Sequence, residues 1–124
     1  LQRIIPDEFS TEVVVLKDDL SRALKVATVF ADSFNKVELH VDPKSKRLGI
    51  ESRNNDIGEN SEKIDASISG KAVHVKLNHR YITDCFQSTG ADTLSLSFAG
   101  EDKPVVIKPV GDKTFTYLIM PMSS

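Results

Sequence analysis

The sequence has 124 residues, of which 40% are hydrophobic, 27% are charged and 6% are aromatic; this balance is typical of one globular domain and excludes a disordered or fibrous chain. The net charge of −2 at pH 7 argues against a free-standing nucleic-acid-binding protein, although a few basic residues gathered on one face remain compatible with it. One cysteine excludes an internal disulfide, and the longest apolar runs are far too short to cross a bilayer.

The first half of the chain reads as a strand, a helix and three strands. Residues 11–16 are rich in valine and predict the first strand. A helix is predicted over residues 17–30, because Leu20, Leu24 and Ala27 recur at helical spacing. Alternating apolar residues or β-branched composition predict the next three strands, at residues 37–41, 46–52 and 64–68.

The second half of the chain repeats this order. A strand over residues 73–77 runs directly into a helix predicted over residues 78–89, with Asn78 as its N-cap. Three more strands are predicted after it, at residues 94–98, 104–108 and 114–120. Each strand has a single apolar side, so each sheet needs a cover on one face only.

The order predicts an internal repeat of two β-α-β-β-β units. Leu16 and Leu77 each end a strand that precedes a helix, and Leu39 and Leu96 lie at similar places in the strand after that helix. Two such units can pair their antiparallel sheets and set both helices side by side on one face. We therefore expect a single α+β domain over residues 1–124.

Basic residues lie on the predicted outer faces of both helices. Arg22, Lys25 and Arg80 fall there, and Lys17 and His79 are further candidates. Taken alone, the pattern is also that of an ordinary solvated helix face. At the end of the first helix, Val29 and Phe30 cannot both face the sheet, so one of them should pack against another surface.

Three short segments resemble a known family. Residues 3–6 are a basic residue, two aliphatic residues and a proline. Residues 77–81 are a predicted strand end followed by an asparagine and, three residues later, a tyrosine. Residues 117–122 are an aromatic residue, two aliphatic residues and Met-Pro-Met. At matching positions over this topology, they make the whole chain similar to the C-terminal third of a bacterial DNA sliding clamp, the β subunit of DNA polymerase III.

The resemblance implies a DNA-clamp fold and a role without catalysis. Family clamps are homodimeric rings that enclose duplex DNA, with helices lining the hole and sheets on the outside. The ring contacts phosphates weakly and without reading bases, so it slides along the duplex and keeps the polymerase processive. By position, the DNA-facing residues are Lys17, Arg22, Lys25, His79 and Arg80. Because the first residues form no long apolar stretch, we expect a cytoplasmic protein, and the resemblance implies that it is nucleoid-associated. We expect no cofactor and no membrane contact.

The resemblance also implies a groove that docks short peptides of the polymerase, the clamp loader and repair proteins. By position the groove is formed by Arg3, Ile4, Phe34, Asn78, Tyr81, Pro104, Leu118, Ile119, Met120, Pro121 and Met122. The competing interpretation makes the strand before Pro121 an edge of the core and Asn78 only a helix cap. Two departures from the family bear on the groove: Ser123 and Ser124 replace a basic and an apolar residue, and family grooves are completed by the preceding domain.

A third implication of the resemblance is contact between subunits. In family rings an apolar pair at the end of the first helix packs on the neighbouring chain, and by position this pair is Val29 and Phe30. The alternative is that Phe30 closes the core and Val29 is a lone exposed apolar residue. A single domain cannot close a ring, so we expect this chain by itself to be a monomer or an adventitious dimer.

The alternative hypothesis is a small α+β enzyme or ligand-binding protein that shares only the layered topology. The sequence gives little support for a catalytic or metal-binding site. Cys85 lies in an apolar helix stripe and is expected to be a buried, inert thiol. The three histidines, His40, His74 and His79, have no metal-ligand spacing with one another or with Cys85, so no metal site is expected.

Overall fold

The computed structural model describes residues 8–112 and 115–122, and its elements follow the predicted order with one additional strand. The elements are β1 (Thr11–Leu16), α1 (Lys17–Val29), β2 (Lys36–Asp42), β3 (Arg47–Asn54), β4 (Gly58–Asp65), β5 (Ser67–Gly70), β6 (Val73–Asn78), α2 (His79–Gln87), β7 (Thr93–Phe98), β8 (Val105–Pro109) and β9 (Tyr117–Ile119). The additional strand arises because the segment predicted over residues 64–68 is divided at Ala66 between β4 and β5. Neither helix in this part of the chain is long and apolar enough to span a membrane.

The strands form two antiparallel sheets that exchange their first strands. One sheet has the order β5-β1-β7-β8-β9 and the other β4-β3-β2-β6. Val13 of β1 lies opposite Leu96 of β7, and Val75 of β6 lies opposite Leu39 of β2. Each β-α-β-β-β unit therefore contributes its first strand to the sheet of the other unit, which confirms the predicted doubled arrangement.

The register refines the predicted correspondence between the two units. Leu39 and Leu96 occupy equivalent positions, as expected, because their partners Val75 and Val13 are equivalent. The predicted match of Leu16 with Leu77 is wrong by one residue. Since α1 begins at residue 17 and α2 at residue 79, the counterpart of Leu16 at the strand end is Asn78, and Leu77 points into the core.

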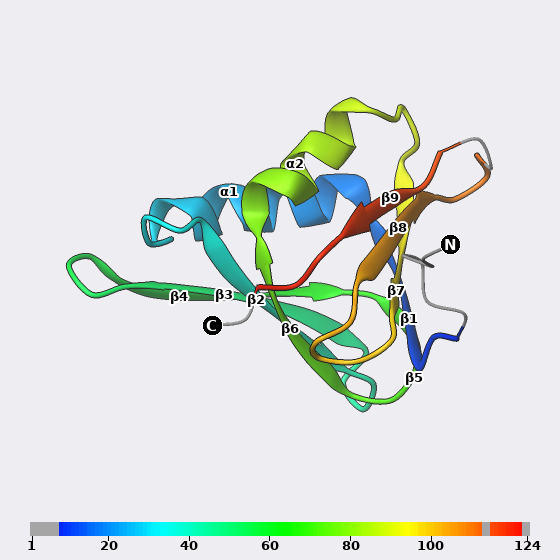
Figure 1. Cartoon of the computed structure of the whole chain (residues 1–124), viewed down its shortest axis with the longest axis horizontal. Helices are drawn as coiled ribbons and strands as arrows, with labels where there is room; N and C mark the ends of the chain where they lie inside the picture. Colours follow the sequence, from blue (N-terminus) through cyan, green and yellow to red (C-terminus); the bar gives the residue numbers. More distant parts are fainter. Residues whose placement is uncertain (1–7, 113–114, 123–124) are drawn as a thin grey trace, which may run out of the picture.

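Both helices lie on the same side of the molecule, at the top of the view in Figure 1, and they contact each other. Helix α1 buries Leu20, Ala23, Leu24 and Ala27, and α2 buries Ile82 and Cys85. They pack on one continuous core that contains the inward valines, leucines and isoleucines of the strands and the fully buried Phe98. The sheets are thus covered on the helix side, as their one-sided alternation predicts.

The C-terminal end of α1 is fixed to β3 by side-chain hydrogen bonds. The buried Ser52 hydroxyl donates to the Ala27 carbonyl oxygen at 2.7 Å, and the Asn54 amide donates to the Ala31 carbonyl oxygen at 3.3 Å. The Ala27 carbonyl oxygen also accepts a hydrogen bond from the Phe30 amide at 3.1 Å, so the Ser52 hydroxyl adds a second bond at the end of the helix, where carbonyl groups lack their usual partners. The anchoring holds the end of α1, including the exposed Val29, at one place on the surface.

Candidate functional site

The chain after β9 crosses from one sheet to the other beside the start of α2. Strand β9 is an edge of the first sheet, and the Met122 amide donates a hydrogen bond to the Lys76 carbonyl oxygen of β6, an edge of the second sheet, at 2.8 Å. Figure 1 shows this final segment passing in front of the sheets and below α2. The crossing brings the predicted Met-Pro-Met end next to the strand that leads into Asn78.

Asn78 begins α2 as its N-cap, as predicted. Its backbone is extended, and its side-chain oxygen accepts a hydrogen bond from the Arg80 amide at 2.9 Å. Tyr81, near the start of the helix, has 51% of its surface exposed. The cap thus fixes the start of the helix, and the fixed helix presents an aromatic side chain to solvent.

The predicted groove residues of the last segment differ in burial. Met120 is 60% exposed, whereas Leu118, Pro121 and Met122 are half-buried. Ile119 is fully buried in the core, so its structural role is that of the competing interpretation, an inward residue of an edge strand. The exposed apolar surface is concentrated at Met120.

Pro104 and Phe34 reach the same region from two other elements. Half-buried Pro104 precedes Val105, which pairs with Ile119. Phe34, 70% exposed, precedes Asn35, whose carbonyl oxygen accepts a hydrogen bond from the His79 amide at 2.9 Å. Two of the predicted groove residues, Arg3 and Ile4, lie outside the described residues.

A hollow of about 370 Å³ lies beside this segment. Its lining combines apolar and charged side chains from three parts of the chain, namely His74, Lys76, Glu101, Asp102, Pro121 and Met122. Sequence reasoning placed only Pro121 and Met122 here. The acidic pair lies in the turn between β7 and β8, and no local pattern indicates that this turn folds back toward β6.

The helix backs present a mixture of basic and acidic side chains. Arg22, Lys25 and Arg80 are exposed, as predicted for the outer stripes. Arg22 pairs with Asp19, and the Lys17 ammonium donates to the Thr89 carbonyl oxygen at 3.3 Å. Exposed Asp18 and Asp84 lie on the same two helices, so the local positive charge is modest.

His79, at the start of α2, is half-buried, as Lys17 is, whereas Arg22, Lys25 and Arg80 are exposed. Burial lowers the pKa of His79, the neighbouring charge of Arg80 lowers it further, and Asp32 opposes both effects only in part. The imidazole is therefore mostly neutral at pH 7, and it adds little positive charge to the helix face.

The pair at the end of α1 divides between surface and core. Val29 has 63% of its surface exposed, and Phe30, the C-cap residue, is half-buried. This is the division expected from the sequence, since the two adjacent side chains point in different directions. Val29 supplies an apolar projection at the helix end.

Cys85 is fully buried, and burial raises the pKa of its thiol to about 11 while the charge of Lys17 lowers it slightly. A thiol that stays protonated at neutral pH is a poor nucleophile. This matches the expectation of an inert core cysteine.

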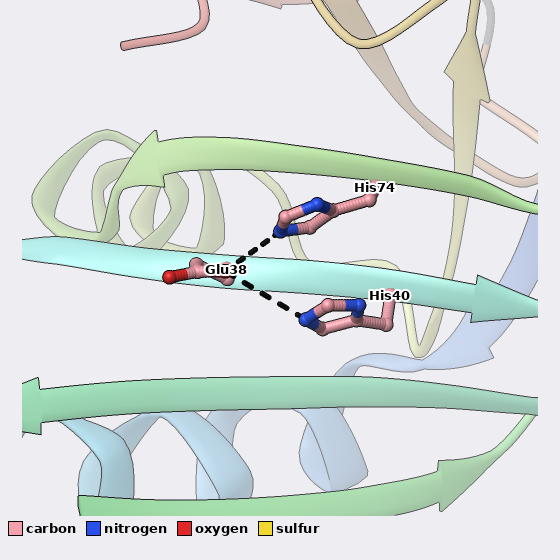
Figure 2. A group of neighbouring side chains, drawn as sticks. All are labelled: Glu38, His40 and His74. Carbon is pink, nitrogen blue, oxygen red and sulfur yellow. Dashed lines mark hydrogen bonds and ion pairs between the residues drawn. The ribbon is translucent and has the colours of Figure 1, made fainter. Parts of the chain in front are cut away.

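Sequence spacing missed one cluster of polar side chains. Glu38, His40 and His74 meet on the outer face of the second sheet, although they come from β2 and β6 and show no ligand spacing along the chain (Figure 2). The sequence spacing gave no indication that His40 and His74 would lie beside one another. Only the pairing of β2 with β6 brings them together.

Comparison with known proteins identifies a family. The family described as DNA polymerase III beta subunit, C-terminal domain, matches residues 2–123. A beta sliding clamp of Synechococcus elongatus is 31% identical over 121 residues, which is 97% of this chain and 32% of that protein, and one of Staphylococcus aureus is 23% identical over the same shares. The chain thus spans about a third of the length of the relatives it matches.

Solved structures share the fold. A DNA polymerase sliding clamp from Bacillus subtilis superimposes with a TM-score of 0.91 at 27% identity, covering 98% of this chain and 32% of that one. The DNA polymerase III β subunit of Thermotoga maritima superimposes with a TM-score of 0.92 at 23% identity, covering 98% and 33%. The doubled unit with both helices on one side is therefore an arrangement that these proteins contain.

Proposed function

This chain belongs to the family formed by the C-terminal domain of the DNA polymerase III β subunit, and from that premise we propose that it is one segment of a ring-shaped clamp around duplex DNA. The observation that carries the proposal is the placement of both helices on one side of the paired sheets (Figure 1). Segments of this shape, joined end to end, form a ring with helices inside and sheets outside. Such a ring confers processivity by topology, because a closed ring leaves the duplex only by opening.

In this proposal the helix backs face the DNA. Arg22, Lys25 and Arg80 are exposed there and would neutralise phosphates without reading bases. Lys17 and His79 contribute less, because the Lys17 ammonium is held by the Thr89 carbonyl and His79 is half-buried. The acidic residues between the basic ones keep the attraction weak, and weak contacts allow the ring to slide.

The second part of the proposal is a docking groove for short linear peptides of polymerase, clamp loader and repair proteins. Its support is the exposed apolar surface of Met120 and Tyr81, together with the hollow that Pro121 and Met122 line directly after Met120. Methionine adapts its shape to varied leucine and phenylalanine side chains. Two buried anchors contribute roughly 1.5–3 kcal/mol each before ordering costs, which gives the weak affinity that lets partners exchange.

The third part of the proposal concerns ring closure through Val29. An exposed valine at a helix end that β3 holds in place is suited to pack on a neighbouring subunit, with Phe30 behind it. In the whole protein we propose a homodimeric ring and no catalytic step, since Cys85 is a buried, protonated thiol.

A peptide titration tests the docking groove. Addition of a short peptide with leucine and phenylalanine anchors to the 15N-labelled chain should shift the amide signals of Tyr81 and of residues 118–122. Met120→Ala should weaken binding about tenfold, the loss of roughly 1.4 kcal/mol. Ile57→Ala, which removes a comparably exposed apolar side chain in the β3–β4 turn, is the matched control and should change nothing.

The same titration can contradict the docking proposal. If the signals of residues 118–122 stay unchanged at high peptide concentration, or if Ile57→Ala weakens binding as much as Met120→Ala does, the exposed methionine surface is not a peptide site. Circular dichroism of each variant separates a loss of binding from a loss of folding.

A further inference from the structure

The cluster of Glu38, His40 and His74 has the geometry of a metal-ligand set. The His74 Nε2 and Glu38 Oε1 atoms lie 2.7 Å apart, and the His40 Nε2 atom lies 3.8 Å from the same Glu38 oxygen. The three potential ligand atoms all lie within 4.8 Å of one another. Figure 2 shows both imidazole rings directing a nitrogen toward the Glu38 carboxylate.

The antiparallel register explains why these side chains converge. His40 and His74 are direct partners across β2 and β6, and their rings stack with centroids 4.1 Å apart and planes 9° apart. Glu38 lies two residues before His40 in β2, so its side chain emerges on the same face of the sheet. On the other side of His40 the partner in β3 is Gly49, which has no side chain to cover the imidazole ring.

The His40 Nε2 atom is the one polar atom of this cluster that is buried and makes no hydrogen bond. Buried polar atoms are nearly always paired, because losing water without a replacement costs free energy. Carboxylate oxygens of Glu38 and Glu51 flank this nitrogen at 3.8 Å and 3.4 Å, and neither forms a hydrogen bond with it. The nitrogen is therefore directed into a small space bounded by oxygen and nitrogen donors.

The charges around this space also favour a cation. Glu38 and Glu51 are direct partners across β2 and β3, an arrangement that repels when both are ionised. Lys76, the partner of Glu38 in β6, and Lys36 in β2 offset part of this charge. A cation held between the two carboxylates would relieve the repulsion directly.

We propose that Glu38, His40 and His74 bind a divalent late first-row transition metal, with Zn²⁺ as the best fit and a carboxylate oxygen of Glu51 as the fourth donor. Two imidazoles with carboxylates suit zinc, whereas magnesium and calcium take oxygen ligands. Zinc needs nitrogen and oxygen ligands at about 2.0–2.2 Å, so the rings must turn slightly from their stacked positions. The metal would join β6 to β2 at the outer face of the second sheet.

The site would link the metal to the stability of the second sheet. Strand β6 is an edge strand that pairs with β2, and its Lys76 carbonyl oxygen accepts a hydrogen bond from the Met122 amide. A ligand that binds only the folded chain raises its stability, and the gain grows with the logarithm of the ligand concentration once that concentration exceeds the dissociation constant. Zinc should therefore raise the thermal midpoint of this chain.

A zinc titration of the wild-type chain tests the proposal without any mutation. With ZnCl₂ alone as the probe, the imidazole 15N signals of His40 and His74 should move together and saturate at one equivalent, while those of His79 stay in place. MgCl₂ at the same concentrations should move none of them. Equal shifts at all three histidines, equal shifts with magnesium, or no saturable shift would overturn the proposal.

Variants provide the second arm of the test. His40→Gln, His74→Gln and Glu38→Gln should each weaken zinc binding at least about tenfold, since even the loss of an indirect partner costs roughly 10–100-fold. Glu59→Gln removes an equally acidic side chain from β4 and is the matched control, which should bind zinc like the wild type. If the double variant His40→Gln, His74→Gln still binds zinc with wild-type affinity, these residues are not the ligands.

Discussion

The two halves of the molecule share one backbone arrangement, and their helices bury side chains of similar size at equivalent positions. Leu20 and Ala23 of α1 have their counterparts in Ile82 and Cys85 of α2, and all four are buried. In each pair a large aliphatic residue is followed, one turn later, by a small residue. A repeat that is nearly invisible in the sequence thus persists in the pattern of side-chain size in the core.

The surfaces of the two halves differ, and the proposed contacts lie where they differ. Helix α1 has 13 residues, begins after Leu16 without a side-chain cap, and ends with exposed Val29. Helix α2 has 9 residues, begins with the capping Asn78, and exposes Tyr81 near its start. The comparison teaches that the fold needs the buried positions of both halves, whereas the proposed protein contacts use exposed residues that the two halves do not share.

The largest expected effect breaks the junction between the halves. Gly70 ends β5 with φ +110°, and a Cβ atom there would lie 2.1 Å from the Ser10 carbonyl oxygen. Gly70→Ala should therefore lower the free energy of unfolding by about 3 kcal/mol or more, measured by urea denaturation. Gly90→Ala, whose Cβ would meet no atom within 4 Å, should change it by less than about 0.5 kcal/mol. Equal losses would mean that β5 is not held as described.

A smaller effect should come from making the two helices more alike. Cys85→Ala gives α2 the residue that α1 has at the equivalent Ala23, and it should cost about 1 kcal/mol by removing one buried atom. Cys85→Ser leaves a hydroxyl in the same apolar site and should cost about 2 kcal/mol. Thermal and urea unfolding of both variants check the order. A serine variant as stable as the alanine variant would contradict a dry environment at this position.

Removing the cap that distinguishes α2 should cost about 1 kcal/mol of folding free energy, which urea denaturation can measure. Asn78→Ala leaves the Arg80 amide without its side-chain acceptor. Asn78→Asp keeps an acceptor and adds a negative charge that the helix dipole favours, so it should stay close to the wild type. If the two variants lose the same stability, the cap is not the reason for asparagine here.

The smallest effect is a dependence of stability on pH from Glu38. Burial raises the pKa of Glu38, but the hydrogen bond from His74 and the charges of His74, His40 and Lys36 outweigh burial and hold the pKa below its usual value. A carboxyl with a lowered pKa in the folded chain stabilises it above the unfolded pKa, and this contribution is lost as the pH falls through the folded value. In metal-free buffer with EDTA, Glu38→Gln should flatten the decline of stability below about pH 4.5. An unchanged decline would assign it to other carboxyl groups.

Most of the fold was predictable from periodicity. Helices and strands that bury one side leave a repeating pattern, and for that reason α1, α2 and β1 fall within a few residues of their predicted ranges. Most of β4 was missed, because its residues from Gly58 to Lys63 are polar and it lies at the edge of its sheet. Charged edge strands protect a sheet from further pairing, and this protection removes the apolar alternation that would reveal them.

Some features of the candidate sites could be predicted from the sequence, and others could not. The cap at Asn78 and the division between Val29 and Phe30 follow from rules that act within one helix turn. The meeting of His40 with His74 depends on a pairing between strands that are far apart in the sequence, and no local spacing encodes it. The turn that brings Glu101 to the hollow is likewise set by tertiary packing.

The central claim is that this chain is one segment of a closed ring on DNA. The most direct measurement compares the retention of a clamp ring containing this domain on circular duplex DNA before and after the circle is cut once. We expect the wild-type ring to stay long on the circle and to be lost rapidly from the ends of the linear DNA. The triple variant Arg22→Ala, Lys25→Ala, Arg80→Ala should leave circular and linear DNA faster than the wild type, and its retention should depend less steeply on salt. Equal retention on circular and linear DNA would contradict the claim.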